Sequence, residues 1–160
     1  MKIAVFTKNK TNPAYAAARL GAARAAERLG AATLHFVPAK GDDPDGQSEL
    51  IDGALAMRVD AIVLAPVHPT RVNAAIARIN AAGVPLFAFV NAISTGRCIS
   101  TVGADDYALG LAIAHHLFAH LEGRGRLLVV SGPVESVSSI ARVRAFHDAA
   151  RTHSAIAMIG

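Results

Sequence analysis

The sequence predicts an α/β fold in which helices flank both faces of a parallel β-sheet, and three observations lead to this prediction. Short strand-like runs alternate with longer Ala-rich and Leu-rich segments along the whole chain, as they do in repeated β–α–β units. The runs at residues 61–65 and 127–130 are continuously apolar, which is typical of strands buried on both faces. Gly30, Gly83 and Gly123 follow three of the longer segments, as left-handed helix C-caps would.

The same signals place the individual elements. Strands are expected at residues 2–7, 32–37, 60–65, 84–90, 99–102, 126–131 and 155–159, and the two apolar runs should be central strands. Helices are expected at residues 13–29, 45–58, 70–82, 105–122 and 137–152. Asn12 and Pro13 suit the N-cap and first position of the first helix. Asp45 is placed to cap the second helix, and Asp105 or Asp106 the fourth.

Polar residues follow the first strand at the point where its apolar run ends. The loop at residues 7–12 is rich in Lys and Asn, and open α/β sheets bind ligands at the carboxyl ends of their strands. Lys8 in this loop, and His68 after the third strand, are candidate ligand contacts by location, with the alternative that each is an ordinary loop residue. The acidic segment at residues 41–46 is expected to be a solvated loop without chemistry.

Length and composition limit the chain to one sizeable core. At 160 residues, 52% of them hydrophobic, it falls short of two ordinary domains. Residues 1–103 contain five expected strands, whereas residues 104–160 contain two strands and two long helices. A polar stretch at residues 94–98 marks the change of character. We therefore expect a complete amino-terminal ligand-binding lobe at residues 1–103 and the start of an incomplete carboxyl-terminal lobe at residues 104–160.

Charge, cysteine content and hydropathy exclude several classes of protein. The net charge is +4, but the basic residues are scattered along the expected helices without a basic run, so no nucleic-acid partner is expected. Cys98 is the single cysteine, which excludes an internal disulfide. No apolar stretch reaches the roughly 18 residues of a membrane span. Met1 and Lys2 lead directly into a strand-like run without an export signal, which leaves a cytoplasmic protein or an exported one whose leader was removed.

No catalytic, cofactor or metal site is predicted. His116 and His120 have the spacing of metal ligands on a helix, but no third ligand accompanies them. The Gly-Arg-Gly-Arg run at residues 123–126 precedes a strand instead of following one, unlike a dinucleotide-binding loop. Ser131 and Ser136 lie near a strand end, but outside any Gly-x-Ser-x-Gly turn and with no paired His. We therefore expect that the protein is not an enzyme.

Five segments, in order along the chain, match the pattern of a known family. They are Lys2-Ile3-Ala4-Val5-Phe6, Thr11-Asn12-Pro13-Ala14-Tyr15, Ala82-Gly83-Val84-Pro85, Val102-Gly103-Ala104-Asp105-Asp106-Tyr107 and Gly123-Arg124-Gly125-Arg126. Together they resemble the type I periplasmic binding proteins that serve sugar-type ABC importers. The resemblance extends over essentially the whole chain. It implies two flavodoxin-like α/β lobes that close like a hinge on a small ligand, with ligand groups from loops at the carboxyl ends of strands in both lobes.

The resemblance also implies ligand-binding residues. Asn12 matches the hydrogen-bonding Asn of the family's Asn-Pro-Phe-Phe turn. Tyr15 matches the second aromatic residue, which stacks on a sugar ring, whereas Ala14 replaces the first. Asn91 stands where the sugar binders have an Asp, often followed by Arg, so it keeps hydrogen-bonding capacity without the charge. Arg142, four residues before a Phe, is the expected ligand arginine of the second lobe, with the alternative of a surface charge.

The function implied is that of a periplasmic solute-binding component of an ABC importer, with a sugar or related polyol as ligand, no cofactor, and the importer's membrane subunits as partners of the full-length protein. An alternative is the effector-sensing domain of a ribose-repressor-type or lactose-repressor-type transcription regulator, which would be cytoplasmic. A helix-turn-helix segment before Lys2 would select the regulator, and an export signal the transporter. Because family members are longer, we expect this chain to bind ligand weakly and to self-associate through exposed strand edges.

Overall fold

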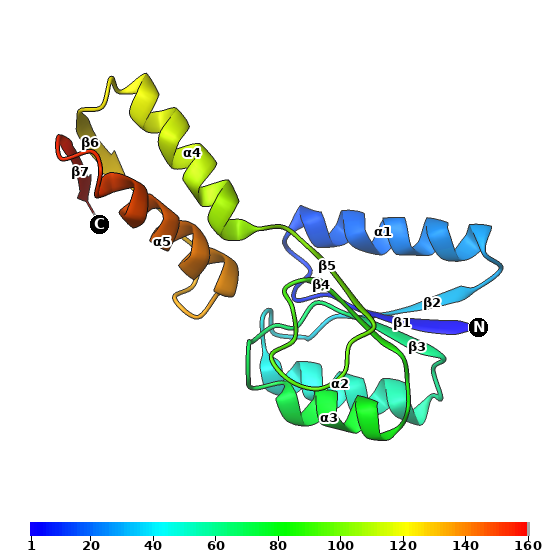
Figure 1. The fold of residues 1–160 in the computed structure, drawn as a ribbon. Helices are drawn as coiled ribbons and strands as arrows, with labels where there is room; N and C mark the ends of the chain where they lie inside the picture. The colour runs from blue at the N-terminus through cyan, green and yellow to red at the C-terminus, as the bar shows by residue number, and fades with distance from the viewer. Residues whose placement is uncertain (160) are drawn as a thin grey trace. The chain divides into compact units, whose positions relative to one another are not determined.

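The computed structural model describes residues 1–159, and it shows the predicted alternation of strands and helices in two compact units, Met1–Gly103 and Ala104–Gly160 (Figure 1). Unit 1 contains β1 (Lys2–Phe6), α1 (Pro13–Arg28), β2 (Ala32–Phe36), α2 (Pro44–Ala56), β3 (Ala61–Leu64), α3 (Asn73–Ala81), β4 (Leu86–Val90) and β5 (Ser100–Gly103). Unit 2 contains α4 (Asp106–His120), β6 (Gly125–Leu128), α5 (Val137–Ala150) and β7 (Ile156–Ile159). None of the helices in the described residues combines the length and apolar character needed to span a membrane.

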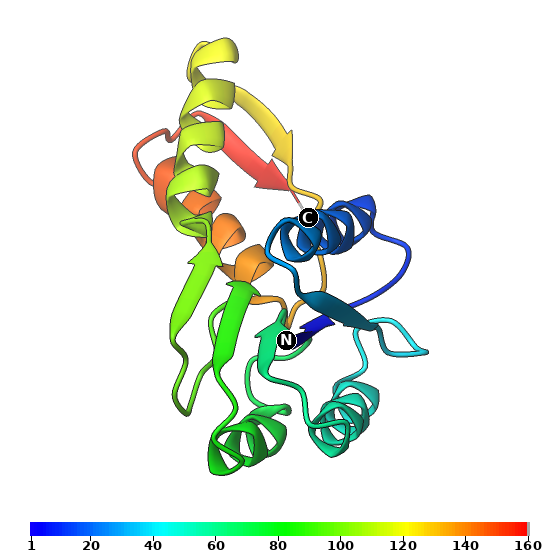
Figure 2. The same cartoon turned by 90° about the vertical axis from the view of Figure 1, so that its right-hand side faces the viewer.

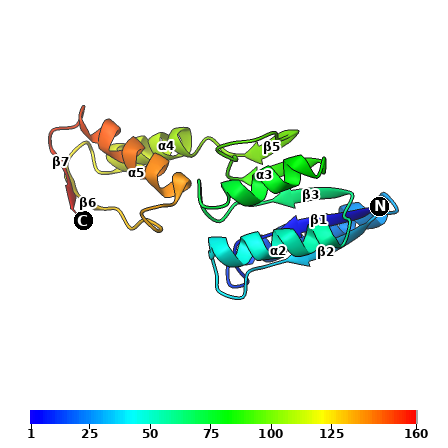
Figure 3. The same cartoon turned by 90° about the horizontal axis from the view of Figure 1, so that it is seen from below.

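Unit 1 is built on a five-stranded parallel sheet with the strand order β2-β1-β3-β4-β5. Helix α1 covers one face of this sheet, and α2 and α3 lie side by side on the other (Figures 2 and 3). The predicted α/β class, with a parallel sheet between helices, is therefore confirmed. Because all five strands run in the same direction, the loops that follow them lie at one edge of the sheet.

The main core of unit 1 lies between the sheet and helices α2 and α3. The central strand β3 contributes Ile62 and Leu64, which are fully buried. They belong to the same apolar cluster as Ile51 of α2 and Ile76 of α3. Burying a side chain of this size stabilises the fold by about 1.5 to 3 kcal/mol. The apolar run at residues 61–65 is therefore a central strand, as its composition predicts.

A buried amide fixes the start of the loop that follows β3. Gln47 of α2 is fully buried. Its Nε2 donates to the Ala65 carbonyl oxygen at 3.0 Å, and its Oε1 accepts the Val67 N–H at 3.0 Å. Burying an amide without partners would be costly, so both bonds are needed to hold Gln47 in place. The helix and the loop are thereby locked together at the carboxyl edge of the sheet.

The helix starts of unit 1 correct one prediction and confirm another. Asn12 caps α1 by accepting a backbone N–H two residues on, and Pro13 occupies the first helical position, as predicted. The prediction that Asp45 caps α2 is wrong, because Asp43 is the N-cap and its carboxylate accepts the Asp45 N–H at 3.2 Å. Pro44 explains the difference, since its fixed φ and missing N–H suit the first helical position and make the preceding residue the cap.

Two of the three predicted glycine caps are confirmed, because Gly30 and Gly83 directly follow the C-caps of α1 and α3. In α4 the left-handed residue that directly follows the C-cap Leu121 is Glu122, with a φ of +52°, and Gly123 comes one residue later. Gly30, Gly83 and Gly123 have φ values of +63°, +69° and +74°, which are left-handed conformations that glycine adopts without strain. Helix α3 begins at Asn73, three residues later than predicted, because a turn around His68 precedes it. The glycine caps therefore give the helix ends more reliably than the apolar pattern gives this helix start.

Unit 2 consists of α4 and α5, packed side by side, and the parallel pair β6–β7 (Figures 1 and 2). Asp105, one of the two predicted caps of α4, is the N-cap, and its carboxylate accepts the Ala108 N–H at 2.9 Å. Phe118 of α4, Phe146 of α5 and Ile156 of β7 belong to one buried cluster. This cluster is separate from the core of unit 1.

Strand β6 differs from its prediction. The run at residues 127–130 was expected to be a central strand buried on both faces, but β6 ends at Leu128, and Leu128 and Val130 are 60% and 88% exposed. Leu127 and Val129 pack instead against the buried cluster of unit 2. Successive side chains of an extended chain point to opposite faces, so the cluster covers one set and leaves the other exposed.

Gly110 allows α4 to approach α5 closely. A Cβ at this position would lie 2.8 Å from Ala145 Cβ and 2.9 Å from the Arg142 backbone. We expect Gly110→Ala to lower the free energy of unfolding of unit 2 by about 1 to 3 kcal/mol, the usual cost of overpacking. Hydrogen exchange of the α4 amides measures this change.

Gly21→Ala in α1 is the matched control. A Cβ at Gly21 has no atom within 4 Å, so this substitution should raise the stability of unit 1 by up to about 1 kcal/mol through helix propensity alone. Hydrogen exchange of the α1 amides measures it. If Gly110→Ala proved as stabilising as Gly21→Ala, the close approach of α4 and α5 at Gly110 would be refuted.

Candidate ligand-binding site

The predicted site residues of unit 1 lie on loops at one edge of its sheet. Lys8 and Asn12 belong to the loop between β1 and α1, and His68 belongs to the loop between β3 and α3. Asn91 directly follows β4, and Tyr15 lies in the first turn of α1. The parallel strand order thus gathers residues that are up to 83 positions apart (91 − 8) at the edge where α/β sheets bind ligands.

Asn12 presents its amide NH2 group to solvent. Its Oδ1 accepts the Ala14 N–H at 2.9 Å, and its own backbone N–H donates to Oδ1 of Asn9 at 2.9 Å. The amide oxygen is therefore used by the helix cap, whereas no acceptor within residues 1–159 bonds to the NH2 group of this exposed residue. Asn12 consequently offers a hydrogen-bond donor to an oxygen atom of a ligand.

Lys8 and Tyr15 are buried, with 9% and 7% of their surfaces exposed. Burial lowers the pKa of Lys8, and the nearby Asp42 carboxylate acts in the opposite direction. Burial raises the pKa of Tyr15 to about 12, and the negative charge of Asp42 adds to the rise. The two candidate side chains therefore share one acidic neighbour. Little of the Tyr15 ring is exposed, and its stacking on a sugar ring stays a prediction.

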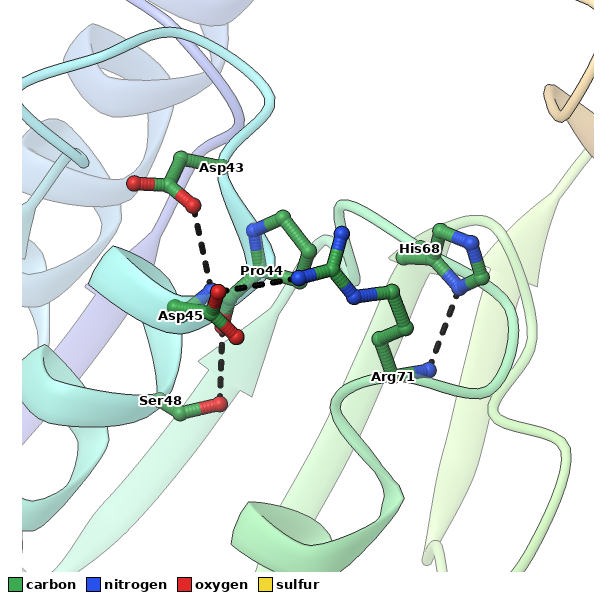
Figure 4. Close-up of polar contacts among 6 residues, drawn as sticks. All are labelled: Asp43, Pro44, Asp45, Ser48, His68 and Arg71. Carbon is green, nitrogen blue, oxygen red and sulfur yellow. Dashed lines mark hydrogen bonds and ion pairs between the residues drawn. The ribbon is translucent and has the colours of Figure 1, made fainter.

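The ring of His68 holds the turn that precedes α3. Its Nδ1 accepts the backbone N–H groups of Thr70 and Arg71, each at 3.1 Å. Figure 4 shows the bond from Arg71. An accepting Nδ1 carries no proton, so the neutral ring is protonated at Nε2. Arg71 also forms an ion pair with Asp45 of α2, with Nη2 2.9 Å from Oδ2. Both side chains of this pair are more than half exposed, so the pair contributes at most about 1 kcal/mol.

Asn91 follows a strained turn at the end of β4. Val90 has a φ of +67°, which a β-branched residue rarely adopts. The Asn91 N–H donates back to the Phe89 carbonyl oxygen at 2.8 Å, which makes the turn tight. Backbone strain of this kind costs about 1 to 3 kcal/mol and clusters at functional sites. The strain is an indication, independent of the resemblance, that the end of β4 has a function.

Sequence reasoning missed the side chains that connect these loops. Asn9 Nδ2 donates to Asp42 Oδ2 at 2.9 Å and links the loops that follow β1 and β2. Ser94 Oγ lies 2.5 Å from the Pro69 carbonyl oxygen and 2.9 Å from Asn73 Oδ1, which links the segment after β4 to the loop before α3. The four loops of the carboxyl edge are therefore joined in two neighbouring pairs by polar side chains.

The link between Asn9 and Asp42 leaves only a weak signal in the sequence. Asn9 could have been singled out, because Asn in a loop commonly bonds to the backbone a few residues on. Its second partner is 33 residues away and follows no pattern. Residues 41–46, which were expected to be a solvated loop without a role, thus include a carboxylate that ties two loops together.

In unit 2, Arg142 is paired with an acid. Its Nη2 lies 2.6 Å, and its Nε 2.8 Å, from Asp106 Oδ1, while the Arg142 side chain stays 52% exposed. A cavity of about 170 Å³ at the end of β6 is lined by Arg142 together with Ser139 and Phe146. Arg142 and Phe146 thus face the same cavity from one side of α5, as their spacing predicts. Unit 2 offers a charged donor beside a small cavity.

A larger hollow of unit 1 does not contain the predicted site residues. Its volume is about 590 Å³, and its lining includes Asn80, Arg97 and Cys98, near the amino ends of β4 and β5. It therefore lies at the opposite edge from the polar loops. Within residues 1–159, no group of three His, Cys, Asp or Glu side chains is arranged to hold a metal ion.

Asp42→Asn is expected to lower the pKa of Tyr15 from about 12, because it removes a negative charge beside the hydroxyl. In the native protein Tyr15 keeps its proton to about pH 12, while the unfolded chain loses it near pH 10. The stability conferred by the protonated form is therefore complete below pH 10 and lost between about pH 10 and 12. A carbon-13 NMR titration of the Tyr15 ring measures the pKa, Glu49→Gln is the charge-matched control, and an unchanged value in Asp42→Asn would refute the coupling.

Comparison with known proteins identifies the family to which this chain is similar. Residues 3–160 match the model of a family described as periplasmic binding protein domain. The D-apiose import binding protein of Actinobacillus succinogenes is 30% identical over 148 residues, which are 91% of this chain and 47% of that protein. The xylitol-binding protein of Mycolicibacterium smegmatis is 28% identical over 101 residues, which are 63% of this chain and 29% of that protein. The chain thus spans about half the length, or less, of these relatives.

Solved structures share the fold. A galactofuranose binding protein superposes with a TM-score of 0.91 at 22% identity, over 99% of this chain and 54% of the other. An ABC transporter solute-binding protein from Burkholderia graminis, in complex with D-arabinose, superposes with a TM-score of 0.93 at 19% identity, again over 99% and 54%. These identities show the fold alone, whereas the family match covers nearly the whole chain. The resemblance seen in the sequence is therefore confirmed, and the chain belongs to the periplasmic binding protein domain family.

Proposed function

We propose that this chain recognises a small neutral sugar or polyol as part of a solute-binding protein of an ABC importer. The observation that carries the proposal is the set of polar loops at the carboxyl edge of unit 1. There, Asn12 offers an amide NH2 group to solvent, Asn91 follows a strained turn, and Lys8 lies buried in the loop after β1. Amides and cations placed together suit a ligand rich in hydroxyl groups.

The named relatives support the ligand class. Two proteins that match the chain in sequence are named for D-apiose import and for xylitol binding. One solved structure with the same fold is in complex with D-arabinose. These ligands are neutral and carry several hydroxyl groups. The amide of Asn91 can both donate and accept hydrogen bonds, as hydroxyl groups do.

The two units differ in the groups that they offer to such a ligand. Unit 1 offers amides that donate or accept, and its cation Lys8 is mostly screened from solvent. Unit 2 offers Arg142, which is half exposed beside a small cavity. We predict that Asn12, Asn91 and Arg142 hydrogen-bond to ligand hydroxyls, with Lys8, Tyr15 and His68 supporting the loops around them. Binding of this kind needs neither a cofactor nor a nucleophile.

The family match also supports a cellular location and a kind of partner, in addition to a ligand class. Its description is that of a periplasmic binding protein domain, and the D-apiose relative is named an import binding protein. We therefore propose a periplasmic location and membrane subunits of an ABC importer as the partners. Both proposals concern the protein to which this chain belongs in the cell.

An NMR titration with D-apiose, xylitol and D-arabinose tests the proposed function. We expect at least one of them to shift the amide signals of Asn12 and Asn91 at millimolar concentration, because one bonded loop edge supplies only a few hydrogen bonds. Asn12→Ala should reduce the affinity by about tenfold, since it removes both the donor and the helix cap. Retained folding is checked by circular dichroism.

Lys10→Ala is the matched control for that titration. Lys10 is exposed in the same loop, so its removal should leave the shifts caused by the sugars unchanged. The proposed function fails if none of the three ligands shifts the signals of the carboxyl-edge loops. It also fails if the shifts cluster around the hollow near Arg97 instead.

Self-association is a second prediction. Within the described residues, β5 pairs with β4 alone, and Ile99 and Val102 beside that open edge are 64% and 72% exposed. An open strand edge favours pairing with another strand, so light scattering should give about twice the chain mass of 16.6 kDa. Val102→Lys should shift the chain toward the monomer, whereas Leu29→Lys at the end of α1 should not. A monomeric wild-type chain would contradict this prediction.

A further inference from the structure

The contact between Asn9 and Asp42 joins two loops that the sequence keeps apart. The Asn9 Nδ2 atom donates to Asp42 Oδ2 at 2.9 Å. The backbone takes part as well, because the Asp42 N–H donates to the Lys8 carbonyl oxygen at 2.9 Å. Two hydrogen bonds in opposite directions therefore hold the loop after β2 against the loop after β1. Both bonds use Asp42, which reaches two adjacent residues, Lys8 and Asn9, of the loop after β1.

The local backbone is shaped for this contact. Asp42 has a φ of +57°, a left-handed conformation that Asp tolerates better than most residues but still at a cost. Gly41 precedes it, and a Cβ at Gly41 would lie 3.1 Å from Asn9 Cβ, so a side chain there would require Asn9 to shift by a few tenths of an ångström. The absence of a side chain at residue 41 thus leaves room for the close approach of the second loop to Asn9. The strained backbone of Asp42 and the close approach of Gly41 to Asn9 therefore occur at the same contact between the two loops.

The carboxylate determines which way the Asn9 amide faces. An ionised carboxylate only accepts hydrogen bonds, so the NH2 end of Asn9 must turn toward Asp42. The oxygen end then faces its own loop, where Oδ1 accepts the Asn12 N–H at 2.9 Å. The Thr11 hydroxyl lies 3.4 Å from the same oxygen. If the amide turned over, Asn12 would lose its acceptor and two NH groups would face each other.

We propose that Asp42 and Asn9 are positioning residues for Asn12. Asp42 orients the Asn9 amide, the Asn9 oxygen holds the backbone of Asn12, and the Asn12 side chain is thereby fixed with its oxygen on the helix cap and its NH2 group toward solvent. The importance of this arrangement for ligand recognition rests on the proposed function. The arrangement itself is a property of the free chain and is tested there.

The consequence for recognition follows from preorganisation. A donor that is already held in its bound orientation loses less entropy when a ligand arrives. Asn12 lies in an exposed loop, where a side chain without such support would sample several rotamers. The contact between the two loops therefore raises affinity without touching the ligand. It also makes the loop after β2 part of the recognition apparatus, although none of its side chains was predicted to bind.

A double-mutant cycle on the full 160-residue chain tests the proposal without any ligand. The readout is the hydrogen-exchange rate of the Asn12 backbone N–H, together with the chemical shifts of its side-chain NH2 group. Asn9→Ala should speed the exchange about fivefold, as expected for one lost hydrogen bond. Asp42→Ala should speed it less, since the Asn9 oxygen remains. In the double variant, Asp42→Ala should add nothing to Asn9→Ala.

Two further variants separate positioning from general destabilisation. Asp42→Asn should stay close to the wild type, because an Asn oxygen can still accept from Asn9 and Asn tolerates the left-handed backbone. Glu49→Gln, an exposed acid of α2, is the control for charge and should change nothing. If the effects of Asn9→Ala and Asp42→Ala on the exchange rate add, or if Asp42→Ala leaves the Asn12 signals unchanged, the proposal is overturned.

The outcome is independent of the proposed function. A wild-type chain that binds no sugar would refute the function, yet the cycle would still report on the position of Asn12. A chain that binds a sugar but shows no coupling between residues 9 and 42 would refute the positioning proposal alone. Where binding is seen, Asp42→Ala should weaken it about threefold and Asp42→Asn less, at unchanged stability of the β1 amides.

Discussion

Parallel strand pairing is the constraint on which the rest of unit 1 depends. Because β1 to β5 all run in the same direction, each connection must return across a face of the sheet, and helices make most of these returns. The strands can pair only if the helices bury both faces, which explains the apolar β3 and the cluster beneath it. The same constraint sends every polar loop that follows a strand to one edge. The backbone geometry alone thus determines the edge at which the proposed recognition site lies.

Loops gathered at one edge still have to be held in place, and the structure uses polar contacts for this purpose. Gln47 fixes the start of the loop after β3 from inside the core. Ser94 and Asn9 do so at the surface, each by reaching a neighbouring loop. Two left-handed residues that are not glycine, Val90 and Asp42, lie at this edge. Strain is tolerated where surrounding contacts over-determine the backbone, and at Asp42 those contacts are the Asn9 side chain and the Lys8 carbonyl oxygen of the adjacent loop.

Much of this fold could be predicted from the sequence, because its signals are local. Alternating composition predicted the order of the elements, and Pro13, Gly30 and Gly83 predicted three helix boundaries. The prediction that Asp45 caps α2 is wrong because Pro44 takes the first helical position and makes Asp43 the cap. The exposure of Val130 could not be read from an apolar run, since composition does not say which neighbours cover a strand. At the site, Asn12 is visible in a local motif, whereas its support by Asp42 depends on two loops meeting in space.

The ion pair in unit 2 has an electrostatic consequence for selectivity. Arg142 shares its positive charge with Asp106, whose side chain is only 16% exposed. A ligand that reaches this guanidinium meets hydrogen-bond donors whose charge is already balanced. A neutral polyol loses no binding free energy through this balance, because its hydroxyls need hydrogen-bond donors and not a net positive charge. A sugar acid gains no net Coulombic attraction to offset the loss of its hydration. If Arg142 contacts the ligand as proposed, the pair therefore disfavours charged ligands through an acid that the ligand does not touch.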